Sequence, residues 1–220
     1  MIDYANEDGL HLITMDEESS TICPDWQQRM LEILREVEDD CDRGASLVLT
    51  GAGKFFCNGL NLEKVMTLTP DEMKGFGRRM GEVHQRLLVL PCPTVAAING
   101  HAFAAGAFLA MSCDYRIMRQ DHGWFSVSEV DVGVPIPPAM MGILRAKLPA
   151  STTRDAVLTG KRYTADEAIL GGIADRQASA EELLMRAKAM ARELGTKEPG
   201  IFSTLKTTLF GSTADALVAG

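Results

Sequence analysis

The sequence predicts an α/β fold in which strands and helices alternate first and helices dominate last. Short apolar runs, such as residues 47–49 and 94–98, alternate with longer segments of helical periodicity. From residue 138 onward, apolar residues recur mainly at helical spacing. These two observations predict a βα-repeat core over residues 1–175 and a helical C-terminal region over 176–220. Because 220 residues can bury one sizeable core, we expect the whole chain to form a single domain.

The N-terminal segments carry recognisable strand and helix signals. Residues 10–15 follow an Asp8-Gly9 turn and alternate in polarity, which predicts a strand. A helix is expected to begin at Pro24, because proline suits the first helical position. Its apolar residues lie at helical spacing: Trp26, Met30, Ile33, Leu34 and Val37. The apolar run from Leu47 to Thr50 predicts a second, short strand.

A second long helix has a clear start. Thr69 is a good N-cap, Pro70 suits the first helical position, and Glu72 lies three residues after the cap. The helix should run to about Leu90, where the Pro91-Cys92-Pro93 sequence ends it. Three internal glycines weaken it. Strands are then expected over residues 94–98 and 114–118, and helices over 138–148, 151–158, 164–170, 179–194 and 199–209.

Charge and cysteine content limit the function. The net charge of −8 argues against a nucleic-acid partner, because a phosphate backbone needs a basic protein face. No apolar stretch reaches the ~18 residues that cross a bilayer, and the acidic N-terminus lacks the pattern of a signal peptide. Five scattered cysteines without a Cys-x-x-Cys pair predict reduced thiols in a cytoplasmic protein. The isolated histidines lack metal-ligand spacing, so no metal site is expected.

Two loops with small-residue turns each follow an apolar strand. The first covers residues 53–62 and the second residues 99–108, and the second turn opens a helix from Gly106 to Ser112. Backbone N–H groups at such turns and helix starts are unpaired and point at whatever lies in front of them. Two of them aimed at one point form an oxyanion hole.

Glu129 follows the two loops and can supply a base for chemistry through an enolate. The simple alternative is a solvated acid at the end of a strand. Its apolar neighbours favour a partly buried strand: Phe125, Val127, Val130 and Val132. A desolvated carboxylate has a raised pKa and is a better base near neutral pH. If the strand continues, Asp131 shares the face of Glu129, as a helper or, in our interpretation, a structural acid.

Glycines after strands most simply mark turns, as they do in any α/β protein. The Gly51-x-Gly53-Lys54 sequence also suggests a phosphate loop. A P-loop would need glycine and serine or threonine where Val48 and Phe55 stand, so nucleoside triphosphate binding is rejected. A dinucleotide fingerprint would need a third glycine where Phe56 stands.

The two loops and the Glu129 segment together resemble the crotonase superfamily of enoyl-CoA hydratases and isomerases. The similarity runs from about Gly9 to about Asp175, and within the superfamily the chain looks most like short Δ3,Δ2-enoyl-CoA isomerases. Four of their motifs occur in order: Gly-Lys-Phe-Phe-x-Asn-Gly at 53–59, Ala-Ala-Gly at 104–106, Leu-Ala-Met-Ser at 109–112 and Ser-Glu-x-Asp at 128–131. The resemblance implies a ββα-repeat spiral that assembles into trimers.

The resemblance also implies roles for individual positions. It makes the backbone N–H groups of Leu60 and Ala105 the two oxyanion-hole donors and Glu129 the proton shuttle. It places five residues in the substrate-binding set: Lys54, Asn58, Gly59, Gly106 and Phe108. Lys54 has two equally weighted interpretations, a ligand of the CoA phosphates and a solvated surface lysine.

Phe108 decides the expected reaction. In hydratases of this superfamily a second glutamate occupies this position and helps to hold and activate a water molecule. Phenylalanine can act neither as acid nor as base, and its ring should keep water away. A single base facing an enolate can instead move a proton from C2 to C4, which shifts a double bond. Even if Phe108 is only an aromatic residue of the core, the site has one carboxylate fewer than the hydratases of this superfamily.

Other residues have less specific interpretations. Lys206 is a weaker candidate for the CoA phosphates, and His101 is interpreted as a buried, hydrogen-bonded structural histidine. The Met-rich residues 137–144 suit an acyl pocket, because methionine adapts to varied apolar shapes, but they suit the core equally. Asn61 stands where the superfamily usually has aspartate, which leaves its part in binding open.

We therefore expect a Δ3,Δ2-enoyl-CoA isomerase without metal or redox cofactor, in which CoA is part of the acyl-CoA substrate. The alternatives are another crotonase-type reaction (hydratase, hydrolase or decarboxylase) and a non-catalytic acyl-CoA-binding paralogue. We also expect a homotrimer or a dimer of trimers, with no nucleic-acid or membrane partner. The C-terminal region supports assembly by its apolar positions: Leu183, Leu184, Ala187, Met190 and Leu194.

Overall fold

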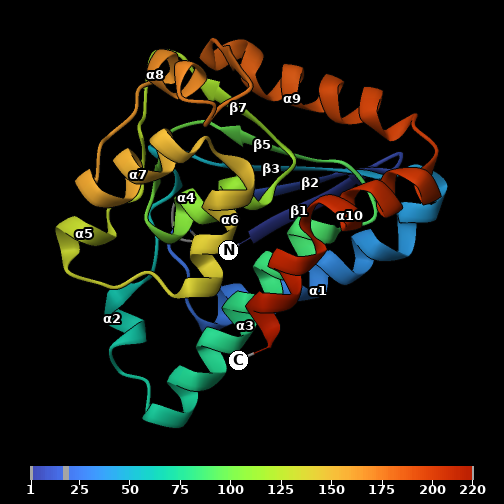
Figure 1. Ribbon diagram of the computed structural model, residues 1–220. Helices are drawn as coiled ribbons and strands as arrows, with labels where there is room; N and C mark the ends of the chain where they lie inside the picture. Colours follow the sequence, from blue (N-terminus) through green and yellow to red (C-terminus); the bar gives the residue numbers. More distant parts are fainter. Residues whose placement is uncertain (1, 17–19, 220) are drawn as a thin grey trace.

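The computed structural model describes residues 2–16 and 20–219 and shows strands enclosed by helices (Figure 1). The strands are β1 (Ile2–Glu7), β2 (Leu10–Met15), β3 (Ser46–Gly51), β4 (Phe55–Cys57), β5 (Thr94–Ile98), β6 (His101–Phe103), β7 (Tyr115–Arg119), β8 (Phe125–Ser126) and β9 (Arg176–Ala178). The helices are α1 (Pro24–Asp40), α2 (Leu62–Val65), α3 (Pro70–Val89), α4 (Ala105–Ser112), α5 (Glu129–Val132), α6 (Pro138–Lys147), α7 (Ala150–Thr159), α8 (Ala165–Leu170), α9 (Ala180–Gly195) and α10 (Pro199–Val218).

The strands form two sheets that together confirm the expected spiral. The larger sheet has the order β1-β2-β3-β5-β7-β9 and is parallel except for the β1–β2 hairpin. The smaller sheet, β4-β6-β8, is parallel throughout. From β3 onward, consecutive strands alternate between the two sheets, as β3 then β4, β5 then β6, and β7 then β8, with helical segments after each of these pairs. This is the ββα repeat, and the predicted α/β fold class is confirmed.

An additional strand, β1, and a longer last helix, α10, are among the differences from the expectation. β1 was not predicted because its sequence is largely polar, and it forms by pairing antiparallel with β2 across the Asp8-Gly9 turn. α10 runs to Val218, beyond the expected end at residue 209, and packs along α3. Gly81 allows this packing, because a Cβ there would collide with the carbonyl oxygen of Leu217. The glycine that weakens α3 locally is thus required for its contact with α10.

The larger sheet buries both faces, as parallel sheets usually do. One face packs against α9 and the other against a larger core that includes residues of α1, α3 and α4 (Figure 1). On α9, Leu183, Ala187 and Met190 are buried against the sheet of their own chain. The prediction that these three residues support assembly into oligomers was therefore wrong. The exposed apolar residues of the C-terminal region lie mainly on α10 instead, at Ile201, Leu205 and Leu209.

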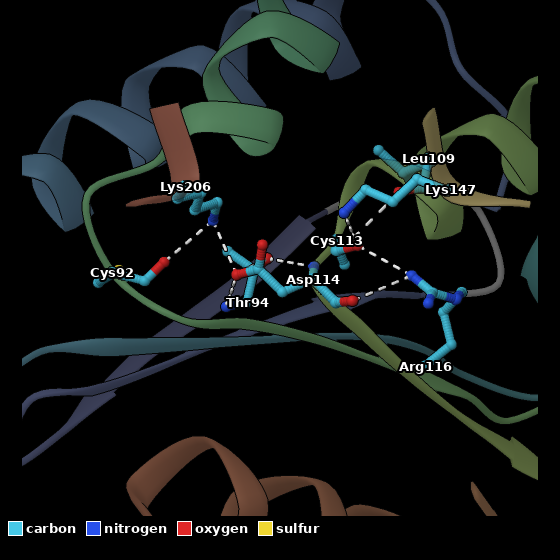
Figure 2. A network of polar contacts seen from close by, with 8 residues as sticks. All are labelled: Cys92, Thr94, Leu109, Cys113, Asp114, Arg116, Lys147 and Lys206. Carbon is cyan, nitrogen blue, oxygen red and sulfur yellow. Dashed lines mark hydrogen bonds and ion pairs between the residues drawn. The ribbon is translucent and has the colours of Figure 1, made fainter. Parts of the chain in front are cut away.

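A buried ion pair attaches α10 to the larger sheet (Figure 2). The Lys206 ammonium, only 3% exposed, lies 2.8 Å from the Asp114 carboxylate and donates to the Cys92 carbonyl at 3.1 Å. The same carboxylate accepts from the backbone N–H and the hydroxyl of Thr94, at 2.9 and 3.0 Å. The Asp114 carboxylate is thus compensated by the Lys206 ammonium and by two hydrogen bonds from Thr94, as a buried charge requires. Lys206 is a structural residue, and its interpretation as a ligand of CoA phosphates is corrected.

The network continues through the backbone of Cys113 (Figure 2). The Lys147 ammonium donates to the Cys113 carbonyl at 3.1 Å and lies 3.8 Å from the ring centre of Phe210 on α10. Burial lowers the pKa of Lys147 to about 8. Arg116 donates to the same carbonyl at 3.0 Å and pairs with Asp175 at 3.0 Å. Helices α6 and α10 are therefore held to the end of α4, whose first residues belong to the candidate site.

Candidate active site

The three candidate catalytic residues follow the three strands of the smaller sheet. Leu60 comes three residues after β4, Ala105 two residues after β6, and Glu129 three residues after β8. Because β4, β6 and β8 are parallel, their carboxyl ends lie at one edge of the sheet. Ligands of parallel sheets commonly bind outside this edge. The topology therefore brings residues that are far apart in sequence to one place.

Two glycines let the two loops touch. At Gly59, where φ is +89°, an added Cβ would lie 3.3 Å from the Ala104 Cβ and 3.6 Å from the Ala105 nitrogen. At Gly106, an added Cβ would collide with the carbonyl oxygen of Cys57, the last residue of β4. Both contacts need a residue without a side chain. Gly59 and Gly106 thus set the distance between the two loops.

The N–H group of Leu60 points away from the segment at Ile22 that pairs with it. Ile22 forms a parallel bridge with Leu60 through the residues on either side of Leu60. The Ile22 N–H donates to the Gly59 carbonyl at 2.8 Å, and the Asn61 N–H donates to the Ile22 carbonyl at 2.9 Å. In such a bridge the N–H of the central residue points to the opposite side. In the described ranges, no backbone carbonyl accepts a turn or loop hydrogen bond from Leu60.

The N–H group of Ala105 is available for a different reason. Ala105 is the first residue of α4, so its N–H has no acceptor within the helix. The preceding residue, Ala104, has φ 48° and ψ −120°, a conformation that L-residues rarely adopt. The Ala104 N–H donates to Ser126 on β8 at 3.0 Å. This bond holds the strained turn against the strand that leads to Glu129.

Glu129 begins a short helix rather than continuing a strand. The expectation of a partly buried strand was wrong, because the Val134 N–H bonds back to the Glu129 carbonyl at 3.0 Å and Gly133 ends the turn with φ +70°. Val130 and Val132 are consequently exposed. The Glu129 side chain itself is half-buried. Its Oε2 is buried, and no described residue gives that atom a hydrogen bond. Burial raises the pKa of the Glu129 carboxyl.

Asp131 does not share a face with Glu129. It lies on α5, and its carboxylate occupies the space that a side chain at Gly160 would need. Because α5 is helical, the strand argument that would have made Asp131 a partner of Glu129 does not apply. This position agrees with the structural interpretation of Asp131.

The substrate-binding candidates divide into two groups. Gly59 and Gly106 lie at the contact between the loops, and Asn58 is exposed beside them, with its N–H bonded to Ser20 at 2.6 Å. Phe108 is on α4, one turn after the donor position, and is 2% exposed as part of the main core. Lys54 is exposed and precedes β4, so it lies toward the amino end of the strand and is not brought to the edge where Glu129 lies. Its part in binding CoA remains a prediction.

Two other interpreted residues have structural contacts. His101 is buried among four aromatic rings, and its Nδ1 accepts from the Trp124 N–H at 3.2 Å, as expected for a structural histidine. Asn61 caps α2, because its side-chain oxygen accepts from the Lys64 N–H at 3.0 Å. An amide serves as this cap as well as a carboxylate does. Within residues 2–16 and 20–219, no three His, Cys, Asp or Glu side chains gather to hold a metal ion.

Comparisons with known proteins agree with this geometry. A family model described as enoyl-CoA hydratase/isomerase matches residues 5–220. "Enoyl-CoA delta isomerase 3" of Arabidopsis thaliana is 33% identical over 91% of this chain and 88% of its own length. A carnitinyl-CoA dehydratase of Salmonella arizonae is 38% identical over 72% of this chain and 60% of its own length. A crystal structure of an enoyl-CoA hydratase from Mycobacterium marinum has a TM-score of 0.86 at 31% identity and covers 100% of this chain and 95% of that one. The chain therefore belongs to the enoyl-CoA hydratase/isomerase family, within the crotonase superfamily.

Proposed function

We propose that this member of an acyl-CoA-processing family is a Δ3,Δ2-enoyl-CoA isomerase. One observation carries the proposal most directly. At the edge shared with two backbone donors, Glu129 presents a buried carboxylate oxygen that has no described protein partner. At the position one turn into α4, where a second acid would be needed to add water, the chain has the buried Phe108. One base and one oxyanion hole are sufficient for proton transfer through an enolate.

The proposed reaction moves one proton. The N–H groups of Leu60 and Ala105 hold the thioester oxygen of a 3-enoyl-CoA. Glu129 removes a proton from C2, and the electron pair of that bond spreads onto the thioester oxygen and the C3–C4 double bond. Glu129 then returns the proton to C4, which leaves the double bond between C2 and C3. Each donor contributes roughly 3–4 kcal/mol to stabilisation of the charged oxygen in comparable sites. The steps use no cofactor besides the CoA of the substrate.

Product analysis tests this proposal. The protein is incubated separately with trans-3- and trans-2-enoyl-CoA, and the products are separated by chromatography. Interconversion of the two positional isomers supports the isomerase. Formation of a free acid or loss of carbon dioxide would indicate a hydrolase or a decarboxylase. Binding of both compounds without any product would indicate a non-catalytic acyl-CoA-binding paralogue.

Hydration of trans-2-enoyl-CoA is expected to be slow or absent. Phe108 offers no group that could activate water, and its burial in the core keeps water out. The measurement is the amount of 3-hydroxyacyl-CoA formed while isomerisation proceeds. The carnitinyl-CoA dehydratase relative makes a hydratase the second candidate, and rapid formation of the hydroxy product would favour it. Replacing Phe108 by glutamate is a poor test, because an unpaired charge in the core destabilises the fold.

A homotrimer or a dimer of trimers is the expected assembly. The apolar residues Ile201, Leu205 and Leu209 recur at every fourth position along α10 and are exposed. Such a stripe is typical of a helix that is covered by a partner. Light scattering coupled to size exclusion should give three or six times the chain mass of 23.9 kDa. A monomer at micromolar concentration would contradict this prediction.

Cytoplasmic location stays part of the proposal. All five cysteines are buried and free, which agrees with the expected reduced thiols. In the described ranges, no helix is long and apolar enough to cross a membrane. The net charge of −8 supports a small-molecule partner over nucleic acid.

A further inference from the structure

The carboxyl end of α4 is in contact with buried cations that the proposed reaction does not use (Figure 2). The Cys113 carbonyl, directly after the helix, accepts from the Lys147 ammonium at 3.1 Å and from the Arg116 guanidinium at 3.0 Å. The same helix begins with Ala105, the second proposed oxyanion donor, and residues 106–112 are all buried. A helix of eight residues is about 12 Å long. The packed helix α4 therefore links these cations to the candidate site.

Lys147 differs from the other cations of this network in having no carboxylate of its own. Arg116 pairs with Asp175 at 3.0 Å, and Lys206 pairs with Asp114 at 2.8 Å. In the part of the chain that the structure describes, no carboxylate forms an ion pair with the Lys147 ammonium. Three cations and two carboxylates leave one uncompensated positive charge at this end of α4, and it belongs to Lys147.

The groups that receive the Lys147 ammonium are a helix end and an aromatic face. Besides the Cys113 carbonyl, the ammonium lies 3.8 Å from the ring centre of Phe210 on α10. Carbonyl groups at the carboxyl end of a helix carry partial negative charge, so a nearby cation is favourable. Replacing a buried charge by an apolar side chain of similar size is nevertheless often neutral or stabilising. Stability alone therefore does not explain a lysine at this position.

We propose that Lys147 is a positioning residue of the oxyanion hole: its ammonium fixes the carboxyl end of α4, and the packed helix orients the N–H group of Ala105. The inference rests on the proposed function, because it takes Ala105 as an oxyanion donor. Such a donor acts at hydrogen-bond distance, so a small shift of α4 lowers the rate. The charge acts in the same direction, because negative charge develops at the amino end of α4 during the reaction.

The test measures kcat and KM for isomerisation of trans-3-enoyl-CoA in four proteins. They are the wild type, Lys147→Met, Lys147→Arg and the control Arg145→Met. Methionine resembles lysine in length without its charge, and the Cys113 carbonyl keeps its hydrogen bond from Arg116, so the variant should fold. Arginine keeps the charge. Arg145 is a matched control, because it lies on α6 with Lys147 but is exposed. Urea denaturation of each protein separates a loss of stability from a loss of positioning.

At pH 7, Lys147→Met should lower kcat by roughly three- to tenfold. Its KM should change less than about twofold, and its urea midpoint should not fall. Lys147→Arg should regain most of the lost kcat, and Arg145→Met should match the wild type. A wild-type kcat in Lys147→Met would overturn the inference. Equal losses in the methionine and arginine variants would also overturn it, because the position would then matter for packing and not for its charge.

The pH profile reports on the same ammonium. Burial lowers the pKa of Lys147 to about 8, although Asp114 raises it, and Arg116 and Lys206 lower it further. Wild-type kcat should therefore fall between about pH 7 and about pH 9 toward the level of Lys147→Met. Neither Lys147 variant should show this fall, since methionine has no charge to lose and arginine stays protonated. The neighbouring Cys113 thiol does not titrate in this range, because burial raises its pKa to about 12.

Two further outcomes are decisive. An alkaline fall of equal size in Lys147→Met would overturn the inference, because another group would then be responsible for it. Failure of the wild type to isomerise at any pH would overturn the proposed function and this inference with it. An active wild type beside an unaffected Lys147→Met overturns the inference alone.

Discussion

Replacing Glu129 by glutamine should lower isomerase turnover by about 10²–10⁴-fold while the protein stays folded and still binds CoA thioesters. Glutamine has nearly the same shape but cannot accept the C2 proton. The carboxylate oxygen Oε2 is buried and has no described partner, so an amide group in its place breaks no hydrogen bond of that atom. Steady-state kinetics and a CoA-thioester binding measurement check both parts. Asp131→Asn is the matched control, because Asp131 is on the same short helix and contacts Gly160 instead.

The stability of the same variant provides an independent check. Burial raises the pKa of Glu129 in the folded protein, so folding favours the protonated carboxyl. The stabilising effect of that protonation is present below the unfolded-state pKa of about 4.3 and is lost as pH rises through the folded-state pKa. At pH 7 the wild type therefore has a buried charge that Glu129→Gln lacks. The variant should be at least as stable at pH 7, and its advantage should disappear below about pH 4.

The pH dependence of the reaction follows from the same shift. Glu129 must be ionised to accept a proton, so kcat/KM should fall as pH decreases through its raised pKa. The fall should begin at a higher pH than for an ordinary glutamate. Wild-type turnover in the glutamine variant, or equal losses in Asp131→Asn, would refute the assignment of Glu129 as the base.

Gly106→Ala should produce the second large effect, a loss of both stability and activity. The added Cβ would collide with the backbone carbonyl of Cys57 and lie 2.8 Å from the Cys57 Cβ. Backbone atoms cannot turn aside as a flexible side chain can, so β4 and α4 must move apart. Overpacking of this kind destabilises by roughly 1–3 kcal/mol. Because Ala105 precedes Gly106, its N–H should also shift, with a loss of about 10²–10³-fold in kcat.

The control for this prediction is Gly77→Ala. Gly77 is exposed in the interior of α3, and no atom lies within 4 Å of an added Cβ. Alanine there should raise the free energy of unfolding by about 0.5–1 kcal/mol and leave turnover unchanged. Urea denaturation and steady-state kinetics measure both variants. A Gly106→Ala protein with wild-type stability and activity would disprove the close approach of the loops.

The sequence predicted the elements that have strong local signals. The start of α3 is a good example, because Thr69 and Glu72 form a reciprocal capping box in which each side chain bonds the other residue's backbone. Such contacts need only neighbouring residues, so they can be inferred without the fold. The wrong strand at Glu129 shows the limit of this approach. Apolar neighbours suggested burial, but Gly133 with its positive φ ends a helical turn and leaves the valines in solvent.

The arrangement of the candidate site depended on long-range contacts that no local pattern contains. β4, β6 and β8 have two or three residues each, too few for an alternation of polarity to be visible. Their parallel order brings the three loop positions to one edge. The strained backbone of Ala104 also had no sequence signal, since alanine rarely adopts a positive φ. The resemblance to a family identified the positions, and the topology explains how they come together.

The buried pair between Asp114 and Lys206 has a consequence for biosynthesis. The two residues are 92 positions apart, and Asp114 immediately precedes β7, the strand next to the edge strand β9 of the larger sheet. At translation rates of about 5–20 residues per second, the ribosome needs roughly 5–20 s to add the lysine after the aspartate. During that interval the carboxylate lacks its cation and cannot be buried without a large desolvation penalty. The start of β7 should therefore stay hydrated on the nascent chain until α10 emerges, and the last helix completes the burial of this carboxylate.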